Sequence, residues 1–405
     1  MIDYLMEAKA LYEHMLRHRR YLHSHAETGF DLNDTCAYVK KALREMGLAP
    51  NDCGRSGIVC TIGVGDTCFL LRADMDALPI QEEAGQAFDC QNGCIHACGH
   101  DLHTAMLLGA AELLKKHEKE LQGCVKLMFQ PAEETLRGAE DMIRNGVLED
   151  PRPVGGMMLH VMTGVPIKTG TVIISAPGVS APEASMFELL VRGRGGHGAS
   201  PEETVDPIHA AAHILLALQS IKARELPSQS GAMLTIGAVQ GGEAPNVIAN
   251  QVLMRGSLRA YSAEECDKLR RRTEEIAQMT AQTFGATAEF YVTSGTPTLI
   301  NDRQMVEFAR KTLPGVLGAQ HVLEAEKMGA SRSSGSEDFA CVSHEIPSVM
   351  LALAAGRTED GYTHGLHHPH TRFDEAAMPY GAAALAGMAM HFLAAHEGAE
   401  FDTKA

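Results

Sequence analysis

The sequence predicts an α/β protein with an additional, smaller α+β domain, and two patterns along the chain predict it. Short, apolar, β-branched segments typical of buried strands occur at 57–64, 67–73, 125–130 and 155–161. Segments with helical periodicity follow at 104–120 and 139–149. Strand and helix therefore alternate, which favours a mostly parallel sheet covered by helices. The second pattern begins after residue 181.

Helical segments also flank the alternating region. Residues 3–21 have helical periodicity, and a second helix is expected from Asp34 to Gly47, where glycine suits a C-cap. The alternation resumes beyond residue 298, with a helix at 306–313, a strand at 347–354 and an alanine-rich helix at 379–396.

The second pattern lies between two proline-bearing stretches, 176–182 and 294–298. Its segments read as strand, helix, strand, strand, helix and strand, at 186–193, 206–221, 232–239, 251–260, 263–284 and 286–292. This βαββαβ order is the ferredoxin-like arrangement, so about 110 residues suffice for a complete small domain.

Composition excludes several classes of protein. At 405 residues, the chain has room for roughly two to three domains. A formal net charge of −16 opposes binding to nucleic acid, and the basic residues Arg17 to Arg20 are expected on a solvated helix face. Apolar runs such as MMLHVM are shorter than the ~18 to 20 residues of a membrane span. Ten cysteines without a secretory signal suggest the cytoplasm.

Three predicted strands end in polar side chains that can do chemistry, namely Asp74 and Asp76, Glu133 and Glu134, and His160. The carboxyl ends of parallel strands are where α/β folds build their sites. Each residue also has a structural interpretation: a turn cap for Asp74, a packed core histidine for His160, and a helix N-terminus for the glutamates. Pro131 breaks the strand just before the glutamates, which favours the functional interpretation for that pair.

The stretch CQNGCIHACGHDLH, residues 90–103, leaves three interpretations open: a structural zinc clip, a disulfide knot, or part of a working metal site. A structural zinc clip is disfavoured because the cysteines are spaced by four and no second pair follows. Gly99 permits a tight turn that directs Cys98 and His100 at one cation, with Asp101 as the expected helix cap. His103, one turn later, is expected to pack or to support the site.

Several motifs carry a family resemblance. They are RADMDALPI, HACGHDLHTAMLLGAA, FQPAEE, GAEDMI, GGHGASP, APNVIAN, GSEDF and LHHP. In this order, spread between about residue 19 and residue 384, they resemble the peptidase family M20 amidohydrolases of the hippurate hydrolase, N-acyl-L-amino acid amidohydrolase and auxin-conjugate hydrolase subgroup. The resemblance implies a zinc-peptidase-like α/β catalytic domain, 1–181 and 295–405, interrupted by a ferredoxin-like lid and dimerisation domain, 182–294.

The resemblance also implies roles for single residues. The metal ligands would be Cys98, His100, Glu134, His160 and His367, with His368 as a rival for the last position. They would hold two divalent ions per subunit, of which Zn²⁺ suits the donors and Mn²⁺, Co²⁺ or Ni²⁺ are alternatives. Such ions supply a nucleophile from water and polarise an acyl oxygen.

Other matched residues would act beside the metal. Glu133 matches the general base, and Asp76 is expected to orient a ligand imidazole by accepting its other N–H. From the lid, His197 would serve the neighbouring subunit of a homodimer, and Asn246 and Arg259 match substrate-carboxylate and lid contacts. Arg259 is equally well explained as a surface charge at a strand end.

Three positions depart from the family pattern. Ala26 stands where proline is usual, and Leu136 and Arg137 stand where many relatives carry glycines. The last two follow the predicted ligand Glu134, so they are expected to reshape the acyl pocket.

The leading hypothesis is a metal-dependent amidohydrolase that cleaves the acyl amide of N-acyl-L-amino acids, from hippurate-like compounds to N-acetyl amino acids. The alternatives are a dipeptidase or aminoacylase of the same fold, a metal-free binding relative, and a hydrolase that uses Cys98 as a thiol nucleophile. Neither nucleic acid nor a membrane is expected as a partner.

Overall fold

The computed structural model describes residues 2–329 and 332–396, which form two compact units. Unit 1 comprises the described residues of 1–180, 300–332 and 338–405, and unit 2 comprises 181–299 and 333–337. The small domain predicted at 182–294 lies within unit 2. Residues 333–337, which the sequence placed with the larger domain, also belong to unit 2.

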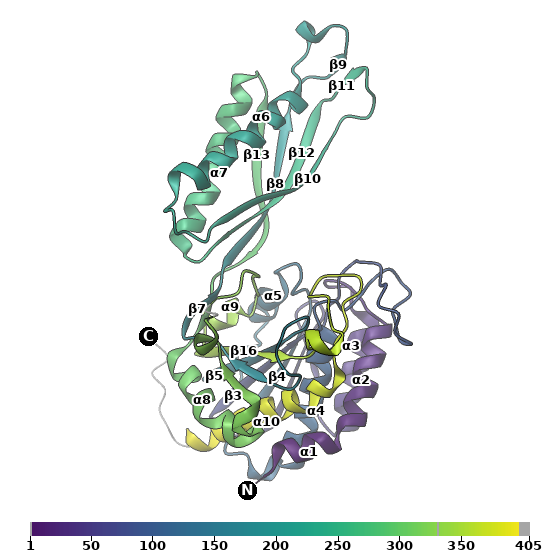
Figure 1. Cartoon of the computed structure of the whole chain (residues 1–405), viewed down its shortest axis with the longest axis vertical. Helices are drawn as coiled ribbons and strands as arrows, with labels where there is room; N and C mark the ends of the chain where they lie inside the picture. The colour runs from purple at the N-terminus through teal and green to yellow at the C-terminus, as the bar shows by residue number, and fades with distance from the viewer. Residues whose placement is uncertain (1, 330–331, 397–405) are drawn as a thin grey trace. The chain divides into compact units, whose positions relative to one another are not determined.

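Unit 1 is built on an eight-stranded mixed sheet with the order β1-β2-β4-β3-β5-β16-β6-β15. Its strands are β1 (Asn51–Cys53), β2 (Gly57–Gly63), β3 (Cys68–Asp74), β4 (Cys124–Gln130), β5 (Gly155–Met162), β6 (Val172–Ile174), β15 (Val322–Glu324) and β16 (Ser348–Ala354). Figure 1 labels β3, β4, β5 and β16 of this sheet. The four central strands β4, β3, β5 and β16 run parallel, as predicted for the core of this sheet. β2 and β6 run antiparallel to their central neighbours, which makes the sheet mixed.

Eight α-helices surround this sheet in the described part of unit 1. They are α1 (Tyr4–Ala10), α2 (Tyr12–Ser24), α3 (Asn33–Glu45), α4 (His100–Lys116), α5 (Gly138–Arg144), α8 (Arg303–Leu317), α9 (Ala340–Ser343) and α10 (Met378–Ala395). The single helix predicted over 3–21 is divided at Leu11 into α1 and α2. α4 and α10 pack on each other and on β3, so their side chains are buried on nearly every face.

One helical stretch of the described chain, Glu375–Ala395, is long and apolar enough to cross a membrane by length and composition. However, 83% of its apolar window is buried inside the structure. It packs against α4, α8 and α1, which is how the core helix of a folded domain behaves.

Unit 2 has its own hydrophobic core beneath a four-stranded antiparallel sheet of order β10-β12-β8-β13. Its main elements are β8 (Glu183–Arg192), α6 (Pro207–Ser220), β10 (Met233–Gly241), β12 (Gln251–Ala260), α7 (Ala263–Thr283) and β13 (Thr287–Thr296). Element order and strand order are those of a ferredoxin-like domain. Two further sheets have two strands each. In unit 2, β9 (Gly196–His197) pairs with β11 (Val247–Ile248). At the boundary between the units along the chain, β7 (Gly178–Ala181) pairs with β14 (Leu299–Asn301).

Candidate metal centre

The parallel strands bring the predicted site residues to one edge of the sheet. Asp74 ends β3, the two glutamates follow β4, and His160 lies near the end of β5. Because β4, β3 and β5 are parallel neighbours, these side chains meet at the carboxyl edge. His100 begins α4 at the same place, as its contacts with Asp74 and Asp76 show.

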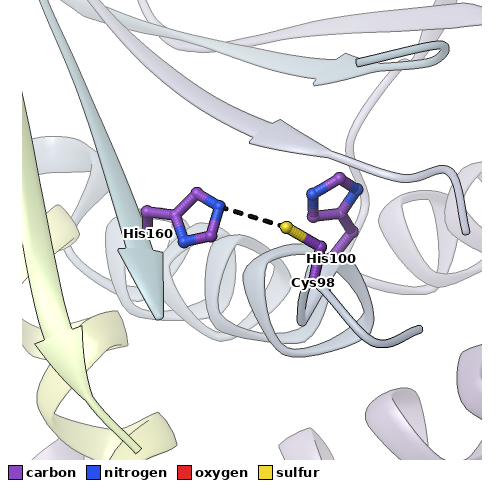
Figure 2. Close-up of side chains that lie close together, drawn as sticks. All are labelled: Cys98, His100 and His160. Atoms are coloured by element: carbon purple, nitrogen blue, oxygen red, sulfur yellow. Dashed lines mark hydrogen bonds between the residues drawn. The ribbon is translucent and has the colours of Figure 1, made fainter. Parts of the chain in front are cut away.

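Cys98 lies at the middle of the cluster. Its Sγ atom is 3.5 Å from Nε2 of His160, the contact drawn in Figure 2, and 3.3 Å from Nε2 of His367. The same His367 nitrogen lies 3.5 Å from Oε2 of Glu134. His100 Nε2 lies 4.0 Å from Oε1 of Glu134. The structure thus brings together all five predicted ligands.

Two overlapping groups of donors are formed in this way. Cys98, His100 and His160 form one, and Cys98, Glu134 and His367 form the other; within each, the donor atoms lie within 4.8 Å of one another. The two groups share the Cys98 thiol. A donor shared between two sets of ligands suits a pair of adjacent cations.

Two buried atoms test whether the residues fit a cation. Nε2 of His100 and Oε1 of Glu134 are buried, and neither has a hydrogen-bond partner among the described residues. A buried polar atom without a partner costs free energy, unless another group satisfies it. Thiolate, imidazole and carboxylate donors are those that transition-metal ions of the zinc type prefer. The residues therefore fit a metal ion.

The electrostatics of the cluster also favour a cation. Burial, together with the nearby Asp76 and Asp74 carboxylates, raises the pKa of Glu134 to about 7. Burial likewise raises the pKa of the Cys98 thiol well above its usual value, although His100 opposes the shift. Positive charge at this position would stabilise both deprotonated groups.

Backbone carbonyl groups fix the orientation of two imidazoles. Nδ1 of His100 lies 2.8 Å from the carbonyl oxygen of Asp76, and Nδ1 of His160 lies 2.7 Å from that of Val161. Because a carbonyl oxygen only accepts, each Nδ1 carries a proton and each Nε2 faces the cluster. Burial would lower the pKa of His100, but Asp74 and Cys98 raise it well above its usual value, so its Nε2 would give up a proton when a cation binds. Burial lowers the pKa of His160 to about 3, so its imidazole is neutral.

Asp76 contacts the site through its backbone and through its carboxylate. Its carbonyl oxygen accepts the other N–H of the His100 imidazole, which is the contact expected of this residue. Its carboxylate accepts the backbone N–H groups of Glu133 (2.9 Å) and Glu134 (3.2 Å), and Nδ1 of His100 lies 3.6 Å from Oδ1. The carboxylate holds the turn that carries both glutamates.

Two neighbouring histidines, His103 and His368, make their contacts with groups other than the proposed ligands. Nδ1 of His103 donates to Asp74 (2.6 Å) and its Nε2 accepts the Val161 N–H (2.8 Å), so both nitrogens have partners. His368 accepts the backbone N–H of His370 and stacks on His364 with 4.3 Å between ring centroids. His367 is thus the histidine of the pair that contacts Cys98. Its φ of +61° is rare for a residue with a side chain.

A buried network behind the cluster was not predicted. Arg19 and His23 of α2 donate to Asp101 at 3.0 and 2.8 Å, and His23 also contacts Glu82 at 2.8 Å. Asp101 therefore does not cap α4, which starts at Gly99 without a side-chain cap. Arg19 is 1% exposed, so the expectation that Arg17 to Arg20 form a solvated face is wrong for this residue.

The remaining cysteines are not part of the cluster. All ten thiols are free, which excludes the disulfide knot. Cys90 donates to Oδ1 of Asn92, and Cys94 packs beside it. Gly99 has a φ of +87°, and a Cβ atom there would lie 2.3 Å from Cγ2 of Val161, so the predicted need for glycine at this turn is met.

Unit 2 carries the three remaining predicted residues. His197 and Asn246 are exposed neighbours on the β9–β11 ribbon, where the N–H of Gly198 donates to the carbonyl oxygen of Asn246 at 2.9 Å. Arg259 is half-buried on β12 and donates to Oγ of Ser336 at 2.7 Å. Arg259 is therefore not an unbound surface charge.

Comparison with known proteins identifies the family. Residues 70–391 match the model of peptidase family M20/M25/M40. The chain belongs to this family. It is therefore an amidohydrolase or peptidase, and the M20 fold accounts for a sheet-based unit whose sequence is interrupted by a ferredoxin-like one.

Relatives of this M20 chain include hydrolases of amino-acid conjugates. It is 34% identical over 392 residues to IAA-amino acid hydrolase ILR1-like 2 of Arabidopsis thaliana, covering 95% of this chain and 86% of that protein. It is 33% identical over 390 residues to N-acetylcysteine deacetylase of Bacillus subtilis, covering 95% and 98%. Among solved structures, a dinuclear metal binding peptidase of the M20 family from Bacillus subtilis superposes with a TM-score of 0.75, at 29% identity, covering 95% and 99%.

Proposed function

We propose that this M20 protein hydrolyses the acyl amide bond of N-acyl-L-amino acids, and that it uses two divalent metal ions. The observation that carries the proposal is the meeting of Cys98, His100, Glu134, His160 and His367 in two donor groups that share Cys98. Relatives named for hydrolysis of an amino-acid conjugate and of an N-acetyl amino acid support the substrate class. Hippurate-like and N-acetyl amino acids are the first candidates.

The metal ions would supply an activated water and polarise the acyl oxygen. Cys98, His100 and His160 would hold one ion, and Glu134 and His367, with Cys98 shared, the other. Zn²⁺ suits a thiolate with imidazoles, and Mn²⁺, Co²⁺ and Ni²⁺ suit the same donors. The relative named as dinuclear supports the number of ions.

Glu133 is the proposed general base. Its Oε2 atom lies 3.9 Å from Nε2 of His100, inside the cluster, and it belongs to neither donor group that contains Cys98. The carboxylate would accept a proton from the attacking water and deliver it to the leaving amine. The Asp76 carboxylate, through the Glu133 N–H, would hold this base in position.

The proposal extends to unit 2 and to assembly. His197 would stabilise the oxyanion at the active site of the neighbouring subunit of a homodimer, and Asn246 and Arg259 would bind the substrate or shape the lid. Exposed apolar side chains on unit 2, among them Leu216 at 68% and Met279 at 66%, support a surface that a second copy covers. A cytoplasmic location belongs to the same proposal.

Two alternative functions are tested together with the proposed one. A dipeptidase would prefer Gly-Gly over benzoyl-glycine. A thiol-nucleophile hydrolase is disfavoured because the raised pKa of Cys98 keeps a metal-free thiol protonated.

The decisive experiment screens purified, metal-reconstituted protein against a panel of acylated amino acids and dipeptides, and reads the released amine. We expect hydrolysis of acylated amino acids, lost with a chelator and restored by added metal. Activity that survives exhaustive chelation would contradict the metal-dependent reaction.

A further inference from the structure

Two arginines flank one aromatic ring close to the turn that carries Glu133 and Glu134. The guanidinium carbon of Arg55 lies 4.1 Å from the centroid of the Phe30 ring, and that of Arg137 lies 5.8 Å from the same centroid. Both arginines are exposed, and Phe30 is half-buried. We call these three residues the arginine cluster.

Backbone hydrogen bonds place Arg137 next to the proposed ligands. The N–H of Leu136 donates to the carbonyl oxygen of Glu133 at 2.7 Å, and the N–H of Arg137 donates to that of Ala132 at 3.2 Å. These bonds close a tight turn in which Arg137 follows Glu134 by three residues. The backbone of Arg137 therefore lies in the same tight turn as the proposed ligand Glu134.

The other two members are joined to the same edge of the sheet. The N–H of Ala132 donates to the carbonyl oxygen of Gly29 at 3.0 Å, which ties the loop of Phe30 to the glutamate turn. Arg55 precedes β2, whose residue Ile58 pairs with Phe129 near the carboxyl end of β4. The cluster thus lies at the same edge of the sheet as the glutamate turn, on its β2 side.

The charges of this cluster are not balanced within the protein. Among the residues that the structure describes, no carboxylate oxygen lies within 4.0 Å of a guanidinium nitrogen of Arg55 or Arg137. The nearby Asp141 carboxylate accepts the backbone N–H of Arg55 at 2.8 Å instead. The two guanidinium carbons lie 4.1 and 5.8 Å from the same ring centroid, so they are within about one Debye length of each other, roughly 10 Å in 0.1 M salt. The two positive charges therefore repel each other. An anion between them would remove this repulsion.

Arg137 lies in a turn whose backbone is unusual for residues with side chains. Leu136 is 5% exposed and has a φ of +54°, so the turn keeps a glycine-like backbone while it carries side chains. A guanidinium here adds a binding group that a glycine cannot supply.

We propose that the arginine cluster binds a second anionic group of the substrate, in addition to the α-carboxylate. This inference rests on the proposed function and narrows it to N-acyl-L-amino acids that carry a further carboxylate. Guanidinium groups bind carboxylates through paired, charge-assisted hydrogen bonds, and the Phe30 ring holds the arginines in place. The further carboxylate belongs either to the acyl group or to the amino-acid side chain.

Matched substrate pairs test this specificity. N-acetyl-L-glutamate against N-acetyl-L-glutamine places the charge on the amino acid, and N-succinyl-L-alanine against N-butanoyl-L-alanine places it on the acyl group. We expect kcat/KM to favour the charged member of at least one pair, and the favoured pair shows which part of the substrate meets the cluster.

Variants then connect the preference to the cluster. Arg137→Gln and Arg55→Gln should each lower kcat/KM for the favoured anionic substrate by about three- to tenfold, mostly through KM, because the charge lies away from the scissile bond. The neutral partner substrate should change less than about twofold. Arg137→Lys keeps the charge but not the paired hydrogen bonds, so its preference should lie between that of the wild type and that of Arg137→Gln.

Arg17→Gln is the matched control, because Arg17 is an exposed arginine of α2 with no ion pair among the described residues, and its loss changes the net charge equally. It should leave the preference unchanged. Wild-type protein that hydrolyses both members of each pair equally, or variants that lower both members equally, would overturn the inference while the proposed function stands. Hydrolysis of no acylated amino acid would overturn the proposed function itself.

Discussion

At the scale of single residues, Glu133 and Glu134 differ in their neighbours rather than in their burial. Their side chains are 8% and 10% exposed. Oε2 of Glu134 lies 3.5 Å from Nε2 of His367, and Glu134 forms a donor group with Cys98 and His367, whereas Glu133 forms one with His100 and Glu134. Burial alone does not separate two such adjacent carboxylates. The donor group with Cys98 supports the proposal that Glu134 holds the metal and that Glu133 transfers the proton.

The Glu133→Gln variant tests this division. We expect turnover to fall by about 10²- to 10⁴-fold because proton transfer is lost, while the metal content per chain stays that of the wild type. Glu134→Gln is the control, and it should lose metal as well as activity. Metal analysis by atomic spectroscopy alongside the assay decides between them; metal loss in the Glu133 variant would reverse the two roles.

His23 makes a pH-dependent contribution to stability. Burial alone would lower its pKa, but hydrogen bonds with Asp101 and Glu82 outweigh it and raise the pKa to about 9, from 6.5 in the unfolded chain. Because the folded state holds this proton more tightly, the contribution is full below pH 6.5 and is lost as the pH rises through 9. It amounts to something on the order of 3 kcal/mol.

Urea unfolding of metal-free protein at pH 6.5 and pH 9.5 measures this contribution. Wild-type protein should lose stability over this interval, and His23→Gln should lose much less of it. His25→Gln, which changes an exposed histidine of the same region, should behave as the wild type. Parallel losses in all three proteins would show that His23 is not the responsible group.

At the scale of elements, the turn before α4 decides where two ligands lie. Gly99→Ala should destabilise the protein and greatly weaken metal binding. The added Cβ would clash with Val161 and Phe373, and the φ of +87° is unfavourable for alanine. Gly47→Ala is the matched control: Gly47 has a φ of +74° but nothing within 4 Å of the added atom.

The measurement for this pair is thermal unfolding together with chelator competition for bound metal. Gly47→Ala should cost only about 1 kcal/mol and leave metal affinity unchanged. Equal effects of the two substitutions on metal affinity would mean that the close packing of Gly99 does not position Cys98 and His100.

Elements with clear periodicity were predictable, and their pairing was less so. The central strands end where alternation of apolar segments predicted, within a residue or two, because each is a short buried run. The antiparallel direction of β2 was missed, since a buried strand reads the same in either direction. The break at Leu11 was missed because no proline or glycine marks it.

Site residues divide in the same way. Cys98, His100 and Glu134 lie in compact motifs at strand or helix ends, so local sequence indicated them. The network of Arg19, His23 and Asp101 was missed, because Asp101 lies 78 or more positions from the other two and only the packing of α2 on α4 brings them together.

At the scale of the whole molecule, the proposed role of His197 requires two subunits. Glu133→Gln and His197→Ala variants should each be nearly inactive as pure proteins. If His197 acts on the partner's site, a mixed dimer regains one complete site, in the His197→Ala subunit, which keeps Glu133 and receives the intact histidine. Random exchange of equal amounts should restore about a quarter of the wild-type activity.

The assay mixes the two variants under conditions of subunit exchange and follows turnover over time. The control mixes Glu133→Gln with Glu133→Gln,His197→Ala, which cannot form a complete site. No recovery in a mixture proven to contain mixed dimers would place His197 with its own subunit or outside the reaction.

The order of strands in unit 1 has a consequence for its synthesis. β16 lies between β5 and β6, yet it is translated after both, and all of residues 181–299 separates them. At a synthesis rate of about 5–20 residues per second, the edges of β5 and β6 remain unpaired for roughly 10 to 40 s before β16 is made. A half-made chain therefore presents unpaired strand edges and an incomplete set of ligands, because His367 emerges later still. On the ribosome, this protein should depend on chaperones that shield such edges, and it should acquire its full metal complement only near the end of translation.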